Sequence, residues 1–178
     1  MTPLRILSIL PLLFMLISAA VTDLRTRKIH NWLTFSIILT GLCRPMLVGA
    51  PPTVGQAVLG MFAGAALPLV LFALGALGGG DVKLLAGVGA WLGPFPSVEV
   101  FCLAAIFGMM IVLAQAITQG RLTVLSRNSA VLALNLFHVQ EVGLEHATAT
   151  GKSCQSVDKP LPYAVPVLLA VATILIFN

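Results

Sequence analysis

Two aspartates, each beside a long apolar run, are the residues best suited to carry out chemistry. Asp23 follows the first apolar run and Asp81 follows the third, in a chain of 178 residues that has only six acidic side chains. Two carboxylates in a partly desolvated place cannot both ionise cheaply, so they tend to share one proton. One then acts as general base toward water and the other as general acid toward the substrate. The pair predicts acid–base hydrolysis, which requires no nucleophilic side chain and no metal.

Three successive glycines precede the second aspartate. Gly78, Gly79 and Gly80 predict the end of a helix, and they allow another backbone to approach closely. A peptide bond inside a helix is sterically closed to attack, so a substrate has to lie extended against the site. We therefore expect these glycines to contact the substrate.

Each of these features also has a simpler interpretation. An aspartate at the end of a membrane helix is often a cap or an interface residue, and a triple glycine is usually a hinge. Two further features favour a functional pair. Lys83 stands two residues after Asp81, and a basic-Ile-x-Asn string at 28–31 closely follows Asp23.

The composition is that of a polytopic membrane protein. Apolar residues make up 58% of the chain, charged residues 9%, and the mean hydropathy is +1.04, values that a water-exposed surface does not allow. The ten basic residues give a net charge of +4 but form no dense run, so nucleic-acid binding is not expected. The cysteines Cys43, Cys102 and Cys154 are widely spaced and indicate neither a disulfide nor a metal site.

Apolar runs predict about six transmembrane helices, at 4–21, 32–48, 54–77, 82–95, 98–117 and 161–177. The first run is also typical of a cleavable signal peptide, but its removal would leave Asp23 without support. The fourth has about 14 residues, or ~21 Å as a helix, which is short for a crossing. Six crossings place eight of the ten basic residues on one side, as the positive-inside tendency requires. We therefore expect an all-α membrane fold with one short helix after the glycines.

The chain is expected to form one integral-membrane domain over residues 1–178. Residues 119–160 are predicted to be a polar cytoplasmic loop, and the 124–142 portion suits a helix lying at the membrane interface. The same topology places Asp23 and Asp81 at similar depth on the cytoplasmic face, where they can meet.

Three motifs resemble those of the type IV prepilin peptidases, which belong to the GxGD class of intramembrane aspartyl proteases. They are Asp23-Leu24-Arg25 with the string at 28–33, the segment 78–85, and Leu161-Pro162-Tyr163-Ala164. The resemblance implies that Asp23 and Asp81 are catalytic. It matches Gly78 and Gly80 to the motif glycines and Lys83 to a basic position of the motif. We assign these three residues, together with Gly79, to substrate binding.

The chain departs from the family pattern at two places. His30 stands where proline is common, and the cysteine-containing insert of the longer, bifunctional members is absent. The resemblance therefore implies the short type found in tight-adherence pilus systems, with cleavage but without methyl transfer.

The implied substrate is a prepilin, in which a short basic leader precedes an apolar helix. Cleavage at the cytoplasmic face of a bacterial inner membrane is expected, without a cofactor, and membrane lipids and pilus assembly machinery are the other expected partners. Two alternatives stay open. A proton- or cation-coupled transporter subunit would favour acids near mid-depth, and a structural assembly subunit would tolerate Asn at either aspartate.

Overall fold

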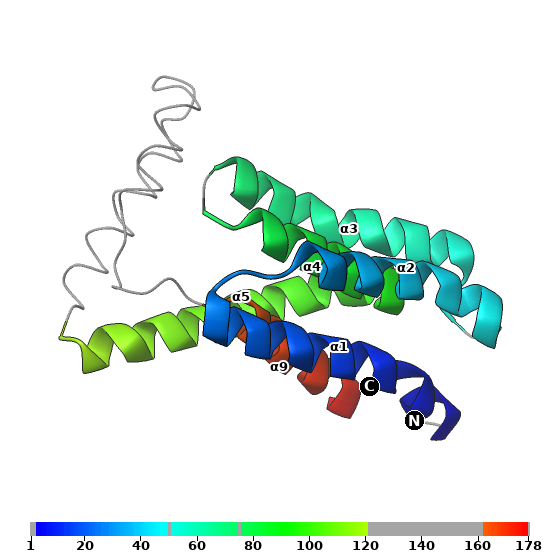
Figure 1. The fold of residues 1–178 in the computed structure, drawn as a ribbon, viewed down its shortest axis with the longest axis horizontal. Coiled ribbons are helices and arrows are strands. Elements are labelled where there is room, and N and C mark those ends of the chain that lie inside the picture. The colour runs from blue at the N-terminus through cyan, green and yellow to red at the C-terminus, as the bar shows by residue number, and fades with distance from the viewer. Residues whose placement is uncertain (1–2, 50, 75, 121–161, 178) are drawn as a thin grey trace.

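The computed structural model describes residues 3–49, 51–74, 76–120 and 162–177, and these form six α-helices and no strand (Figure 1). The helices are α1 (Pro3–Thr26), α2 (Asn31–Val48), α3 (Val54–Ala73), α4 (Gly79–Leu92), α5 (Pro94–Thr118) and α9 (Ala164–Phe177). The predicted all-α class is confirmed. The interfacial helix predicted at 124–142 lies outside the described residues.

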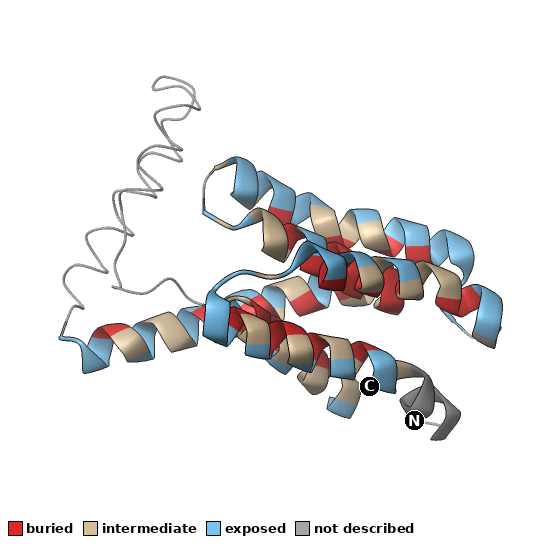
Figure 2. Ribbon diagram, viewed as in Figure 1, coloured by how far each residue is buried: buried red, intermediate tan, exposed pale blue. Residues whose placement is uncertain are grey.

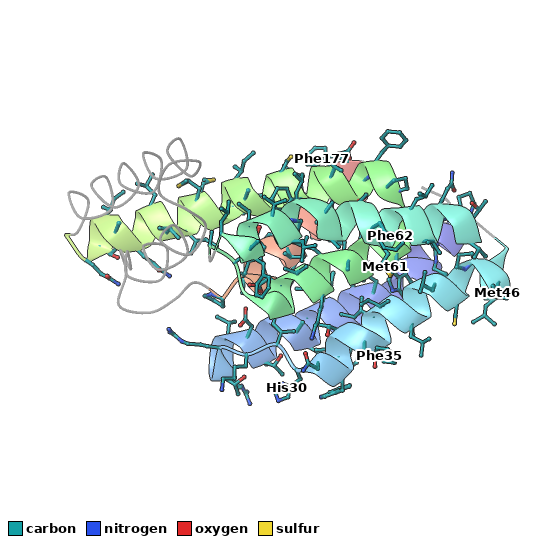
Figure 3. The ribbon with its side chains drawn as sticks, turned by 90° about the horizontal axis from the view of Figure 1, so that it is seen from above. His30, Phe35, Met46, Met61, Phe62 and Phe177 are labelled. Carbon is teal, nitrogen blue, oxygen red and sulfur yellow. The ribbon has the colours of Figure 1, made fainter. Side chains whose placement is uncertain are left out.

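Three of these helices are long and apolar enough to cross a membrane: α1 from Ile9, α3 and α5. Helix α9 is apolar but has 14 residues. Large apolar side chains point away from the bundle, and Figure 3 shows this for Phe35, Phe62 and Phe177, which are 65%, 63% and 85% exposed. An apolar outer surface of this extent is suited to lipid and not to water.

Helix α4 is the centre of the bundle and packs between α2 and α3 (Figure 1). It is buried on nearly all sides (Figure 2), with nine of its 14 residues buried. A helix that is apolar all round requires such a cover. The 14 residues of α4 agree with the short apolar run predicted after the glycines.

Glycines allow α4 to lie this close to its neighbours. Gly60 and Gly64 of α3 face the backbone of α4, and a Cβ at Gly60 would overlap the carbonyl oxygen of Gly89. On the α2 side, a Cβ at Gly87 would come 2.7 Å from the side chain of Ile37. Small residues at helix contacts are common in membrane proteins for this reason.

Helix boundaries differ from the sequence prediction at three places that matter for the site. Helix α1 continues to Thr26, so Asp23 lies in its last turn and not beyond it. Helix α4 begins at Gly79, so two of the three glycines belong to its first turn instead of ending a helix. Helix α5 begins at Pro94, because the first helical turn accepts proline, whose missing N–H has no helical partner there.

Helices α2, α3 and α4 form one layer, and α1, α5 and α9 form the second. Within the second layer, α9 packs against both α1 and α5. The start of α1 and the end of α9 lie toward one end of the bundle, and α5 projects beyond the other helices at its C-terminal end (Figure 1). The end of α1 and the starts of α4 and α9 therefore come together at the opposite end.

Candidate active site

Asp23 is fixed by a bond between the first and last described helices. Its side chain is 6% exposed, and its Oδ2 accepts a hydrogen bond of 3.1 Å from the backbone N–H of Ala164. The first N–H groups of a helix have no partner within the helix, so a carboxylate at this position satisfies one of them and favours the positive end of the helix dipole. The start of α9 thus sets the orientation of Asp23.

Asp81 is the third residue of α4 and caps its own helix. Its Oδ2 accepts a hydrogen bond of 3.2 Å from the backbone N–H of Gly78, the residue before the helix. A Cβ at Gly78 would lie 3.0 Å from this oxygen, so glycine leaves room for the carboxylate to fold back. One oxygen of Asp81 is used for the cap, and the side chain is half-buried.

Both aspartates line one pocket of about 750 Å³. Gly78, Gly80 and Tyr163 line the same pocket, and one wall is formed by the α5 residues Ala105, Gly108, Met109 and Val112. The wall of α5 is apolar, whereas the end formed by α1, α4 and α9 carries the acids. The pocket thus joins an acidic end to an apolar side.

The carboxyl group of Asp81 holds its proton more firmly than an ordinary aspartate. Asp81 precedes the segment 82–95 and lies outside the three helices that are long enough to cross the membrane. Burial raises its pKa to about 6, and the charge of Asp23 adds to the increase, while the hydrogen bond from Gly78 opposes it. This direction is the one expected where two neighbouring carboxylates share a proton.

Basic and polar residues of the α1–α2 connector and of the start of α2 form the other side of the pocket. Arg27, Lys28 and Asn31 line it, and both basic side chains are exposed. Arg27 has a left-handed backbone with φ of 52°, and its N–H donates to the carbonyl oxygen of Asp23 at 2.9 Å. In the sequence, Arg27 counted only among the basic residues that indicate topology, whereas Lys28 also begins the string at 28–33 that follows Asp23; the place of both residues in the wall of the pocket was not predicted.

The four residues predicted to bind substrate fall into two groups. Gly78 and Gly80 line the pocket, whereas Gly79 and Lys83 are not part of its lining. Lys83 is exposed, and its Nζ donates to Asn31 Oδ1 at 2.9 Å, which links α4 to the start of α2. A role for Gly79 and Lys83 in binding substrate stays a prediction.

Sequence reasoning also missed the pocket role of Tyr163 and of the α5 wall. Tyr163 lies in a motif that marked only the start of the last helix, and it is the single tyrosine of the chain. The α5 residues lie within an apolar run in which no position stands out. In the part of the chain that the structure describes, no three His, Cys, Asp or Glu side chains gather as metal ligands do.

These features describe an all-helical membrane protein in which two aspartates line one pocket. Residues 10–113, more than half of the chain, match the type IV leader peptidase family. The chain therefore belongs to this peptidase family, and the resemblance seen in its motifs is confirmed. The matched segment contains both aspartates and ends before α9. No curated protein and no solved structure matches the chain.

Proposed function

We propose that this protein is a membrane-embedded aspartic endopeptidase that removes the short basic leader from prepilins of the type IV or Flp-like kind. One observation carries the proposal: Asp23 and Asp81, 58 positions apart in the sequence, line one pocket at the end where three helices begin or finish. The family supplies the reaction class, since its members are leader peptidases.

The reaction needs only water and one shared proton. The ionised carboxylate takes a proton from water while the water oxygen bonds to the carbonyl carbon of the peptide. The protonated carboxyl gives its proton to the carbonyl oxygen, which leaves a neutral gem-diol. The amide nitrogen then takes a proton from the first aspartate, the C–N bond breaks, and one hydroxyl proton returns to the second aspartate. The pair titrates as a unit, so either aspartate can fill either role.

The shape of the pocket supports a substrate that is part polar and part apolar. The α5 wall offers small and apolar side chains, among them Ala105 and Gly108, which suit contact with an apolar helix. Gly78 and Gly80 lie beside Asp81, where an extended backbone has to pass. A leader joined to an apolar helix has its cleavage point at this kind of boundary.

The charge distribution supports a site that faces the cytoplasm. Arg25, Arg27, Lys28 and Lys83 lie at the end of the bundle that carries the aspartates, whereas Arg44 lies near the other end of α2. The positive-inside tendency then favours the acidic end on the cytoplasmic side of a bacterial inner membrane. Four residues, 27–30, connect α1 to α2, which is too few for the cysteine-containing insert of the longer, bifunctional members. We therefore propose cleavage without methyl transfer. Lipids and the pilus assembly machinery are the proposed partners.

Leader cleavage by co-expressed variants tests the proposal. The chain is expressed with a candidate prepilin, and leader loss is followed by gel mobility for wild type, Asp23→Asn and Asp81→Asn at equal membrane levels. Glu99→Gln is the matched control, because Glu99 is an exposed acid near the start of α5 and does not line the pocket. We expect both aspartate variants to be inactive and the control to cleave normally. Normal cleavage by either aspartate variant would refute the two-carboxylate mechanism and favour a transporter or a structural subunit.

A further inference from the structure

Tyr163 is held beside the two aspartates by the start of α9. It directly precedes the first residue of this helix, is half-buried, and lines the same pocket as Asp23 and Asp81. Its carbonyl oxygen accepts a hydrogen bond of 3.3 Å from the N–H of Val167, and Val167 is fully buried. The backbone at Tyr163 is thus part of the first helical turn and not of a free loop.

The neighbouring residue fixes this turn on the site itself. Ala164, which is fully buried, donates its N–H to Asp23. A shift of α9 would therefore move Tyr163 and Asp23 together, which keeps their relation constant. No hydrogen bond joins the Tyr163 hydroxyl to another residue among those that the structure describes. The hydroxyl is available to donate to a group that enters the pocket.

The phenol remains protonated at any pH at which the aspartates work. A phenol ordinarily has a pKa of ~10, several units above that of a carboxyl group. A phenol in this state donates a hydrogen bond and does not act as a base. Arg27 and Lys28 also line the pocket, but both are exposed, so water competes for their donors.

We propose that Tyr163 is a catalytic hydrogen-bond donor whose hydroxyl binds the carbonyl oxygen of the peptide bond that is cleaved. This inference rests on the proposed function and adds a third side chain to it. When water attacks, the carbonyl π electrons move onto this oxygen, which takes its proton from one aspartate. The Tyr163 hydroxyl donates to the second lone pair of the same oxygen and keeps its own proton throughout. No further reactant is needed.

The expected size of the effect follows from donors of this kind. Removal of one donor to a developing oxyanion usually lowers kcat about 10²- to 10³-fold. The aspartate proton already neutralises part of the charge here, so we expect Tyr163→Phe to lower kcat by about 10- to 100-fold, with KM changed by less than about threefold. Phenylalanine keeps the ring and its packing and removes only the hydroxyl.

Two peptide inhibitors separate this role from a structural one. In one, a tetrahedral carbon bearing a hydroxyl replaces the scissile carbonyl; in the other, a methylene replaces it. A donor to the oxygen predicts that Tyr163→Phe weakens binding of the hydroxyl inhibitor by about the factor lost in kcat/KM and leaves the methylene inhibitor unaffected. A merely structural role would weaken both equally and would overturn the inference.

A measurement on the wild-type protein covers the case in which the variant does not fold. Tyr163 is the only tyrosine, so with tyrosine-free inhibitors the tyrosine bands in ultraviolet resonance Raman spectra report this residue alone. We expect the hydroxyl inhibitor to shift these bands and the methylene inhibitor to leave them unchanged. Equal spectra with both inhibitors would refute a hydrogen bond to the oxygen.

The failure of this inference differs from the failure of the proposed function. If wild type does not remove the leader of any prepilin while its fold is intact, the proposed function fails and the inference fails with it. If wild type cleaves and Tyr163→Phe cleaves with the same kcat, only the role of Tyr163 is refuted.

Discussion

A single methyl group at Gly60 is expected to force α3 away from α4. A Cβ at Gly60 would overlap the carbonyl oxygen of Gly89 and would lie 2.8 Å from the Cα of Gly93. All of these atoms belong to the backbone, so no side chain can rotate to make room. Overpacking of this kind usually costs about 1–3 kcal/mol, and we expect Gly60→Ala to reach the upper end of this range.

The matched control is Gly55→Ala in the same helix. A Cβ at Gly55 meets no atom within 4 Å, and the residue is exposed. Alanine is favoured over glycine in a helix by up to about 1 kcal/mol, so this variant should be as stable as wild type or more stable. The two changes are chemically identical and differ only in their surroundings.

Thermal unfolding in detergent, at one scan rate, measures the difference. A loss of about 3 kcal/mol corresponds to a decrease in Tm of about 6–12 °C for a chain of this size. Since α4 carries Asp81, leader cleavage by Gly60→Ala should also decrease at temperatures where the variant is folded. A Tm of Gly60→Ala equal to or above that of Gly55→Ala would refute the close backbone contact between α3 and α4.

Three further predictions concern the charged residues. Because the pKa of Asp81 is raised to about 6, kcat/KM for leader cleavage should decrease as pH rises above about 6, where the pair loses its shared proton; a profile that still increases toward about pH 8 would contradict this. Lys83→Met and Asn31→Ala should each lower stability by about 0.5–1.5 kcal/mol, and their double variant should lose no more than one of them, because both remove the same bond. Arg44→Met should lower Tm more than Arg25→Met does. The buried guanidinium of Arg44 donates to carbonyl oxygens of Pro51 and Trp91, whereas Arg25 is exposed. Equal Tm values for the two variants would contradict this.

Much of the fold and the two central site residues could be predicted because they depend on local composition. Apolar runs define the helices, and an acid beside such a run is conspicuous, so Asp23 and Asp81 stood out without a structure. Helix boundaries were less predictable. Helix α1 continues to Thr26, and the carboxylate of Asp23 in its last turn accepts a hydrogen bond from the N–H of Ala164. That partner lies 141 residues away in the sequence, and no local pattern reveals it.

The rest of the site depends on contacts between distant segments. Tyr163 belongs to a motif that marks a helix start, and Arg27 is one of the basic residues that indicate membrane topology. Only the packing of α9 and α1 brings both to the pocket. Lys83 shows the opposite case. Its match to the motif led us to assign it to substrate binding, which stays a prediction, and the hydrogen bond from its Nζ to Asn31, which connects two helices, was not foreseen. Spacing along one helix therefore identified the motif without specifying the partner of each side chain.

The two aspartates are held by different means, and this difference bears on how a substrate enters. Asp81 belongs to α4, which α2 and α3 enclose, so its backbone has little freedom to move. Asp23 instead depends on a single hydrogen bond to α9, a helix that contacts α1 and α5 more extensively than α4. A substrate helix that lies along the α5 wall would contact α5 directly and would meet α4 only at Gly80 and Asp81, where α4 lines the pocket. We therefore expect substrate binding to move Asp23 and Tyr163 more than it moves Asp81.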